Sequence, residues 1–396
     1  DEIVQMIRGA KGSVVRLDIL PADAGPDGGH RLINLRRDKI SLDKQAASKA
    51  ILTLKDGDAT RRIGVITLPA FYEDFEAFNK GDKDYRSASH DVAKLLGELK
   101  QENVDGVLID LRNNGGGSLP EAIELTGLFV GKGPVVQQRG ADGKIKVESD
   151  DLKVPAWAGP LGVLINRGSA SASEIFAAAI QDYGRGLIIG EPSFGKGTVQ
   201  TVVDLDQLVH NSKPEFGELK WTIAQFFRVN GGTTQLRGVT PDISLPGFSD
   251  PKSIGETSYD NALPWRQIKP ADYKPVGDIT GLLPKLESLH DARVRDDRDF
   301  QRYVEDIAEL KVQRDKGVVS LNEAERRKEL AHQASRLKAR KGPNDGVDLG
   351  NDDGMQSDER SLTADIAIEN ARKKATDVLL NEAAAILADD VDLQRH

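Results

Sequence analysis

The chain has 396 residues, of which 38% are hydrophobic and 30% charged, and its formal net charge at pH 7 is −9. The length predicts two or three domains, and the negative charge argues against a general nucleic-acid binder. The absence of cysteine excludes disulfides, thiol chemistry and thiolate metal sites. No apolar run of about 18 residues occurs, so no transmembrane segment is expected. The chain starts at Asp1 rather than Met, and we therefore expect a processed or truncated product whose missing front could have carried an export signal.

The first residues have the pattern of a helix followed by two short strands. Asp1–Arg8 is amphipathic, whereas Ser13–Pro21 alternates between apolar and polar residues and Arg31–Arg36 is also strand-like. Elements this short cannot bury a core of their own. The next stretch, 39–62, is predicted to be a connector.

A regular alternation of strands and helices then runs to Gly190, which predicts a mainly parallel α/β layer. The predicted strands are Ile63–Leu68, Gly106–Leu111, Leu161–Ile165 and Leu187–Ile189, and the predicted helices are Asp84–Glu102, Leu119–Val130 and Glu174–Tyr183. Ligands of such sheets gather at the carboxyl ends of the strands. The loops after the second and third strands share that edge, which would bring Gly115–Gly117 towards the serines described next.

Three serines alternate with alanines where a strand gives way to a helix, at Ser169, Ser171 and Ser173. A hydroxyl at the start of a helix lies near unpaired N–H groups and the positive end of the helix dipole, a good place to stabilise an oxyanion. The structural alternative is an N-cap, because Ser171 with Glu174 fits the capping-box pattern. The local pattern alone leaves both interpretations open.

The glycine-rich loop that follows carries Lys196, the only lysine between Leu161 and Gln200. Gly190–Lys196 matches a phosphate-binding loop as far as the lysine. Gly197 then occupies the place of the magnesium-binding Ser or Thr, and the next residues are strand-like rather than helical. Nucleotide binding is therefore not expected, and Asp110, which mimics a nucleotidase aspartate, is discounted on the same grounds.

The last third of the chain is predicted to be mostly helical. Trp221–Val229 is a strand, and the proline-rich stretch that follows, 248–284, is irregular with Trp265 packed against a neighbour. Charged, leucine-spaced helices are predicted at Leu282–Arg314 and Leu321–Arg340, and a further helix at Leu362–Leu387. The acidic segment 342–360 is expected to be a flexible linker.

The stretch SASASEIFAAAIQDYGRGLIIGEPSFGKGTVQ, with LRNNGGG at Leu111–Gly117 and FFRVNGGTTQLRGVTPDI at Phe226–Ile243, resembles the carboxy-terminal processing, or tail-specific, serine proteases. The resemblance covers most of the chain and is strongest to the long periplasmic branch. It implies an α/β core of the crotonase or ClpP type. The implied domains are the C-terminal part of a PDZ domain at 1–38, a connector at 39–62, the protease core at 63–247 and a mostly helical domain at 248–396.

Position by position, the resemblance implies a serine–lysine dyad. Ser171 matches the nucleophile, Lys196 the general base and Gln200 the orienting partner of the lysine. Asp182 matches an aspartate of the catalytic set, for which a structural salt bridge is also weighed. The N–H groups of Gly117 and Ala172 match the oxyanion hole.

A lysine acts as a base only when it is neutral near pH 7, which requires its pKa to fall by about 3 units from its free value. Burial among Phe194, Val199 and small glycines would have that effect. Histidine, the usual base, is found in no recognisable constellation. The six histidines are His30, His90, His210, His290, His332 and His396.

The resemblance further implies a periplasmic endopeptidase that needs no metal or other cofactor. Its substrates would be proteins or peptides with apolar C-termini, and a lipoprotein adaptor is a candidate partner. A nucleic-acid partner is not expected. The alternative is a catalytically inactive scaffold on the same fold that binds a partner through its helices.

Overall fold

The computed structural model describes residues 6–20, 28–38, 46–56, 59–74, 77, 80–81, 85–211, 216–250, 253–318, 320–329, 331 and 377–395. The chain divides into two compact units. One consists of Asp1–Lys44 with Arg314–Asp377, and the other of Gln45–Gln313 with Val378–His396. All the residues predicted to form the active site belong to the second unit.

The described part of the first unit is mainly an antiparallel ribbon of β1 (Val14–Ile19) and β2 (Arg31–Arg36). Its register pairs Val14 with Arg36 and Ile19 with Arg31. Every residue of β2 is exposed, as expected for strands of a short two-stranded ribbon. The two predicted strands are confirmed, whereas their assignment to a PDZ domain stays a prediction.

The second unit is built on a six-stranded sheet in the order β12-β9-β8-β5-β4-β3. All its strand pairs are parallel except β3 with β4, which confirms the predicted mainly parallel α/β layer. The strands are β3 (Ser48–Asp56), β4 (Ala59–Thr67), β5 (Gly106–Asp110), β8 (Leu161–Ile165), β9 (Leu187–Gly190) and β12 (Ile243–Ser244). All residues of β5, β8 and β9 are buried, which explains their continuous apolar sequences.

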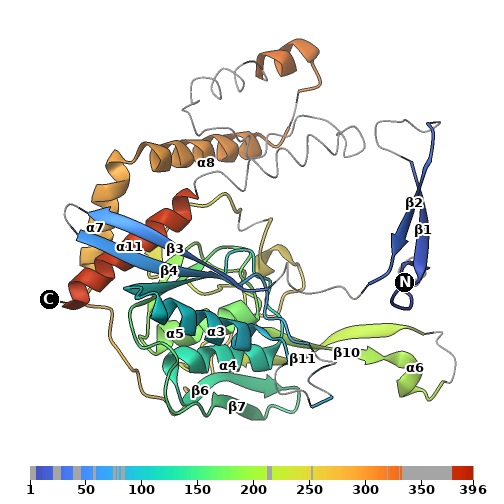
Figure 1. Ribbon diagram of the computed structural model, residues 1–396, viewed down its shortest axis with the longest axis horizontal. Helices are drawn as coiled ribbons and strands as arrows, with labels where there is room; N and C mark the ends of the chain where they lie inside the picture. The colour runs from blue at the N-terminus through green and yellow to red at the C-terminus, as the bar shows by residue number, and fades with distance from the viewer. Residues whose placement is uncertain are drawn as a thin grey trace. The chain divides into compact units, whose positions relative to one another are not determined.

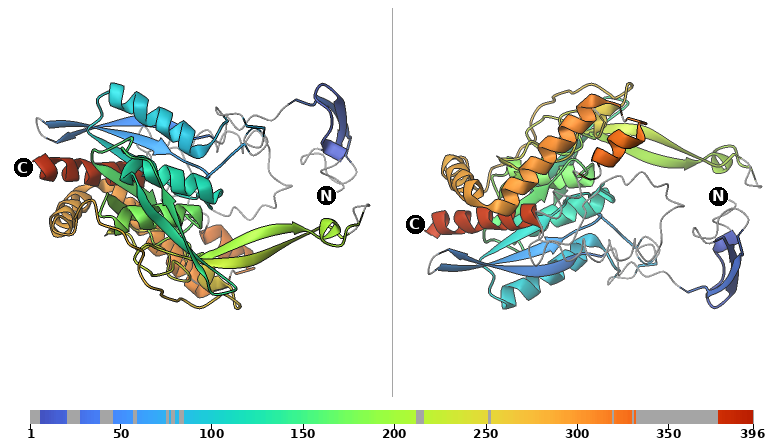
Figure 2. Two further views of the ribbon diagram at one scale, coloured as in Figure 1. Left: turned by 90° about the horizontal axis from the view of Figure 1, so that it is seen from below. Right: turned by 90° about the horizontal axis from the view of Figure 1, so that it is seen from above.

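Helices cover both faces of this sheet (Figure 1, Figure 2). One face packs against α3 (Ala88–Gln101), α4 (Leu119–Val130) and α5 (Ala172–Asp182). The other face packs against the C-terminal helix α11 (Val378–Arg395), helped by α7 (Leu283–Asp296). The last part of the chain therefore completes the same core that carries the predicted active-site residues.

A second, four-stranded sheet has the order β10-β11-β6-β7. Its strands are β6 (Gly133–Gly140), β7 (Ile145–Asp150), β10 (Thr198–Asp204) and β11 (Glu218–Phe227). Figure 1 shows β10 and β11 reaching away from the six-stranded sheet, with the short helix α6 (Leu205–Leu208) at their far end. Exposed apolar side chains, including Val202, Trp221 and Ile223, lie along this hairpin.

Some elements differ from the sequence-based prediction. The stretch 39–62 contains β3 and the start of β4, and the sequence pattern also missed β6 and β7. The helix predicted at Leu282–Arg314 is two helices, α7 and α8 (Arg298–Lys316). Between them Asp297 is extended, and its carboxylate accepts hydrogen bonds from the N–H groups of Asp299 and Phe300, which starts the second helix.

Two further predictions fall largely on residues whose structure is not described here. The linker 342–360 lies outside the described residues, as do half of Leu321–Arg340 and the first part of Leu362–Leu387. The described end of the last predicted helix is α11, which continues to Arg395. Among the described residues, no helix has the length and apolar character needed to cross a bilayer.

Candidate active site

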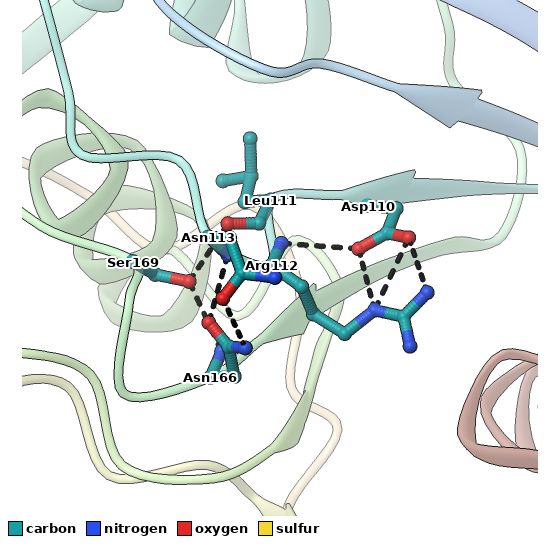
Figure 3. Close-up of polar contacts among 6 residues, drawn as sticks. All are labelled: Asp110, Leu111, Arg112, Asn113, Asn166 and Ser169. Carbon is teal, nitrogen blue, oxygen red and sulfur yellow. Dashed lines mark hydrogen bonds and ion pairs between the residues drawn. The ribbon is translucent and has the colours of Figure 1, made fainter. Parts of the chain in front are cut away.

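Two loops at the carboxyl edge of the six-stranded sheet are tied together by hydrogen bonds (Figure 3). One follows β5 and the other follows β8. The hydroxyl of Ser169 donates to the carbonyl oxygen of Leu111 at 2.8 Å, and the N–H of Asn113 donates to the side-chain oxygen of Asn166 at 2.8 Å. These hydrogen bonds fix the loop after β5 against the loop that carries the serine cluster.

The loop after β5 begins with an ion pair between Asp110 and Arg112. The guanidinium of Arg112 contacts both carboxylate oxygens of Asp110, with Nη2 at 2.6 Å from Oδ2 (Figure 3). Asp110 is only 5% exposed. Its carboxylate thus holds the start of the loop through Arg112, a structural role rather than that of a nucleotidase aspartate.

Ser171 has a backbone conformation that residues other than glycine rarely adopt, with φ 58° and ψ −110°. It is the residue immediately before α5, and its N–H donates to Glu174 Oε2 at 2.8 Å. Such strain is maintained only where the surroundings enforce it, and it is typical of a nucleophile presented on a sharp strand-to-helix turn. The backbone thus distinguishes Ser171 from a serine that only caps a helix.

The two neighbouring serines have structural roles. Ser169 and Ser173 are fully buried, whereas Ser171 is partly exposed. The hydroxyl of Ser169 binds the Leu111 carbonyl, and that of Ser173 donates to the carbonyl oxygen of Asn114 at 2.8 Å. Of the three serines, Ser171 is therefore the one placed to meet a substrate.

The glycine loop passes directly against Ser171, as the sequence predicted. A Cβ added to Gly116 would lie 2.9 Å from Cβ of Ser171 and 3.0 Å from the nitrogen of Ala172. Gly117 has φ 147°, and a Cβ there would lie 2.2 Å from the carbonyl oxygen of Phe71. Only glycine permits this approach. Within the described part of the chain, the N–H groups of Gly117 and Ala172 donate no hydrogen bond, so both are available to a ligand.

Lys196 lies in the loop after β9 and is partly buried. Burial lowers the pKa of its amine below the usual 10.5, and the positive charge of Lys220 lowers it further, whereas Glu256 and Glu174 act in the opposite direction. The net direction is the one that a lysine base needs. Within the described residues, no hydrogen bond joins this amine to the Ser171 hydroxyl. Catalytic contacts are often long in the absence of substrate.

A buried carboxylate, that of Glu174, connects the serine and lysine loops. Its Oε2 accepts from the N–H groups of Ser171 at 2.8 Å and Lys196 at 3.0 Å. Its Oε1 accepts from the Ser193 hydroxyl at 2.6 Å and the Gly195 N–H at 2.7 Å. Burial raises the pKa of Glu174 to about 7, although these donors oppose the rise. The sequence showed this residue only as part of a capping box, and no sequence signal pointed to its contacts with the lysine loop.

Within the described residues, neither Gln200 nor Asp182 is hydrogen-bonded to Ser171 or Lys196. Gln200 is on β10 with an exposed side chain, and no hydrogen bond within the described residues joins it to Lys196. Asp182 is the last residue of α5, about 16 Å from Ser171 at 1.5 Å per helical residue. Its carboxylate binds Arg228 Nη2 at 2.5 Å and Asn230 Nδ2 at 2.8 Å. These contacts fit the salt-bridge role that was weighed for Asp182.

The described residues contain no cluster of three or more His, Cys, Asp or Glu side chains that could hold a metal ion. What they do contain is a strained serine at a helix start, a partly buried lysine with a lowered pKa and free backbone N–H groups beside the serine. On an α/β sheet, these are the parts of a serine hydrolase.

Residues 62–245 match Peptidase family S41, and residues 249–392 match the C-terminal domain of tail specific protease. Through residues 62–245, the chain belongs to peptidase family S41.

Three proteins with related sequences are also carboxyl-terminal-processing or tail-specific proteases by name. The tail-specific protease of Haemophilus influenzae is 42% identical over 325 residues, covering 81% of this chain and 44% of that protein. The chloroplastic carboxyl-terminal-processing peptidase 2 of Arabidopsis thaliana is 33% identical over 246 residues, covering 62% of this chain and 42% of that protein. The carboxy-terminal-processing protease of Bartonella bacilliformis is 35% identical over 251 residues, covering 61% and 49%. The chain spans less than half the length of each of these relatives.

The raised pKa of Glu174 predicts a pH-dependent contribution to stability. A rise from the ordinary 4.5 to about 7 corresponds to roughly 3 kcal/mol. Because the folded protein favours the neutral acid, this stability is complete below pH 4.5 and is lost as the pH rises through about 7. Urea unfolding of wild type and Glu174→Gln across this range should show wild type losing stability relative to the variant. Parallel pH dependences would show that Glu174 is an ordinary carboxylate.

Proposed function

We propose that this chain is the proteolytic part of a tail-specific serine endopeptidase, with Ser171 as nucleophile and Lys196 as general base. The observation that carries the proposal is the shared acceptor: the backbone N–H groups of both residues bind the same oxygen, Oε2 of Glu174. A serine in strained geometry is thereby held beside a lysine whose pKa is lowered. The strained backbone of Ser171 and the lowered pKa of Lys196 both support nucleophilic attack by the serine with the lysine as base.

In the proposed reaction, the neutral amine of Lys196 takes the proton of the Ser171 hydroxyl as the oxygen attacks the peptide carbonyl carbon. The N–H groups of Gly117 and Ala172 donate to the resulting oxyanion. The lysine then gives its proton to the leaving nitrogen, the C–N bond breaks and an acyl-enzyme remains. Water, deprotonated by Lys196, releases the acid and restores the serine. Gln200 stays a prediction as the partner of the lysine, and we assign Asp182 to supporting α5.

We also propose that the substrates are extended polypeptides with apolar C-termini, encountered in the periplasm. The β10–β11 hairpin starts two residues after Lys196, and the alternate residues Leu219, Trp221 and Ile223 form an exposed apolar track on one of its faces. The relative from Haemophilus influenzae is named a tail-specific protease, which is consistent with substrates selected at their C-terminal end. A lipoprotein adaptor remains a candidate partner.

Replacing the serines one at a time tests the nucleophile. Ser171→Ala should lower kcat for a peptide substrate by roughly 10⁴-fold or more, while the melting temperature changes little. Ser169→Ala and Ser173→Ala are the controls: the first loses two hydrogen bonds and the second loses one, so each should cost about 1–3 kcal/mol of stability and keep catalysis. An active Ser171→Ala protein would contradict the assignment, and inactivity of all forms including wild type would favour the scaffold alternative.

Replacing the lysine tests the base. Lys196→Arg keeps the positive charge but cannot deprotonate, so it should be as inactive as Lys196→Ala. In wild type, activity should rise with pH through one ionisation below 10.5. Lys220→Gln removes a nearby positive charge and should move this ionisation to higher pH, whereas the exposed Lys153→Gln should not. Near-normal cleavage by Lys196→Arg would require another base.

A further inference from the structure

A groove of about 460 Å³ lies behind the lysine loop, where β11 ends and the following turn meets the irregular segment that contains Trp265. Its lining is polar and includes two arginines but no Asp or Glu. The lining residues that bear on the argument are Arg228, Asn230, Thr233, Arg237, Thr240 and Trp265. A surface of this composition favours an anion.

The two arginines differ in whether a carboxylate neutralises their charge. Arg228 is neutralised by Asp182, with Nη2 at 2.5 Å from Oδ1, and the side chain of Asn230 is bound to the same carboxylate. Arg237 is exposed and, among the described residues, has no carboxylate partner. Arg237 is thus the groove's available positive charge, in a chain whose net charge is −9.

The Arg237 side chain is held in place without being neutralised. Its Cζ lies 4.1 Å from the centroid of the Trp265 ring, a cation–π contact. The indole is fixed in turn, because its Nε1 donates to the carbonyl oxygen of Thr233 at 2.9 Å. Stacking occupies one face of the guanidinium and leaves its N–H edge free to bind a planar carboxylate with two hydrogen bonds.

The groove wall also supports the lysine loop. Leu236 N–H donates to the carbonyl oxygen of Gly195 at 2.8 Å, and the Thr234 hydroxyl contacts the carbonyl oxygen of Lys196 at 3.4 Å. The side-chain oxygen of Gln235 accepts from Gly197 N–H at 2.8 Å. A chain bound in the groove would therefore lie next to the loop that carries the proposed base.

We propose that this groove is a secondary binding site for an acidic segment of a polypeptide substrate, in which Arg237, stacked on Trp265, binds an Asp or Glu side chain. The inference rests on the proposed function for the identity of the ligand as substrate. Thr233 and Thr240 supply neutral hydroxyl groups around the same space. The site would select substrates by charge at a point separate from the scissile bond.

Binding can be measured without cleavage in the full chain carrying Ser171→Ala. The probe is a fluorescent peptide with a Glu-rich segment, compared with the same peptide in which each Glu is Gln, by fluorescence anisotropy. We expect the Glu peptide to bind more tightly, and Arg237→Gln to weaken it about tenfold without affecting the Gln peptide. Arg237→Lys, which keeps the charge but not the planar fork, should fall between.

Arg266→Gln is the matched control, since Arg266 is an exposed neighbour of Trp265 that does not line the groove. It should bind the Glu peptide within about twofold of the parent protein. Equal effects of Arg237→Gln and Arg266→Gln, or equal affinity for the two peptides, would overturn the proposal. Displacement of the Glu peptide by millimolar phosphate or acetate as readily as by unlabelled Glu peptide would show an anion site with no preference for polypeptide, and would also overturn it. Because none of these readouts needs hydrolysis, failure of the groove and failure of the serine–lysine mechanism are distinguishable.

Discussion

One buried carboxylate, that of Glu174, is the interaction on which the arrangement of the site depends. Four donors converge on it, from the backbones of Ser171, Gly195 and Lys196 and from the hydroxyl of Ser193. A fully buried carboxylate is costly unless its oxygens are satisfied, and the four donors are what offset that cost. The same hydrogen bonds hold the serine loop and the lysine loop together, because both loops donate to this one carboxylate.

The same carboxylate constrains the electrostatics of the proposed reaction. A full negative charge near Lys196 would favour the ammonium form, yet burial raises the pKa of Glu174 to about 7 and so weakens that charge near neutral pH. Lys220, on the projecting hairpin, acts on the amine in the opposite sense. The pKa of the base is thus set by burial, by the positive charge of Lys220, and by the opposing charges of Glu256 and Glu174. The C-terminal helix α11 also supports the site, because it covers the sheet face opposite α5 and completes the core to which these loops are attached.

The sequence predicted those parts of the structure that depend on local pattern. The buried strands Gly106–Asp110 and Leu161–Ile165 and the helix after Ser171 were visible as apolar runs and periodicity, and their parallel order placed the glycine loop beside the serine. Strand β3 was missed because it pairs antiparallel at the sheet edge and has mixed polarity. The role of Glu174 was missed because its partners at 193–196 are brought to it by tertiary structure, and one residue in a capping box carries no sign of them.

The most direct test of the account is the rate at which a serine-directed fluorophosphonate probe labels the full chain as a function of pH, with the site mapped by mass spectrometry. The account predicts a single adduct on Ser171, formed at a rate that rises with pH through one ionisation below 10.5. The rate should fall more than about tenfold in Glu174→Gln, because the amide nitrogen of Gln cannot accept the hydrogen bonds that one carboxylate oxygen takes from the serine and lysine loops. Labelling of another residue, or equal labelling rates for wild type and Glu174→Gln at every pH, would contradict it.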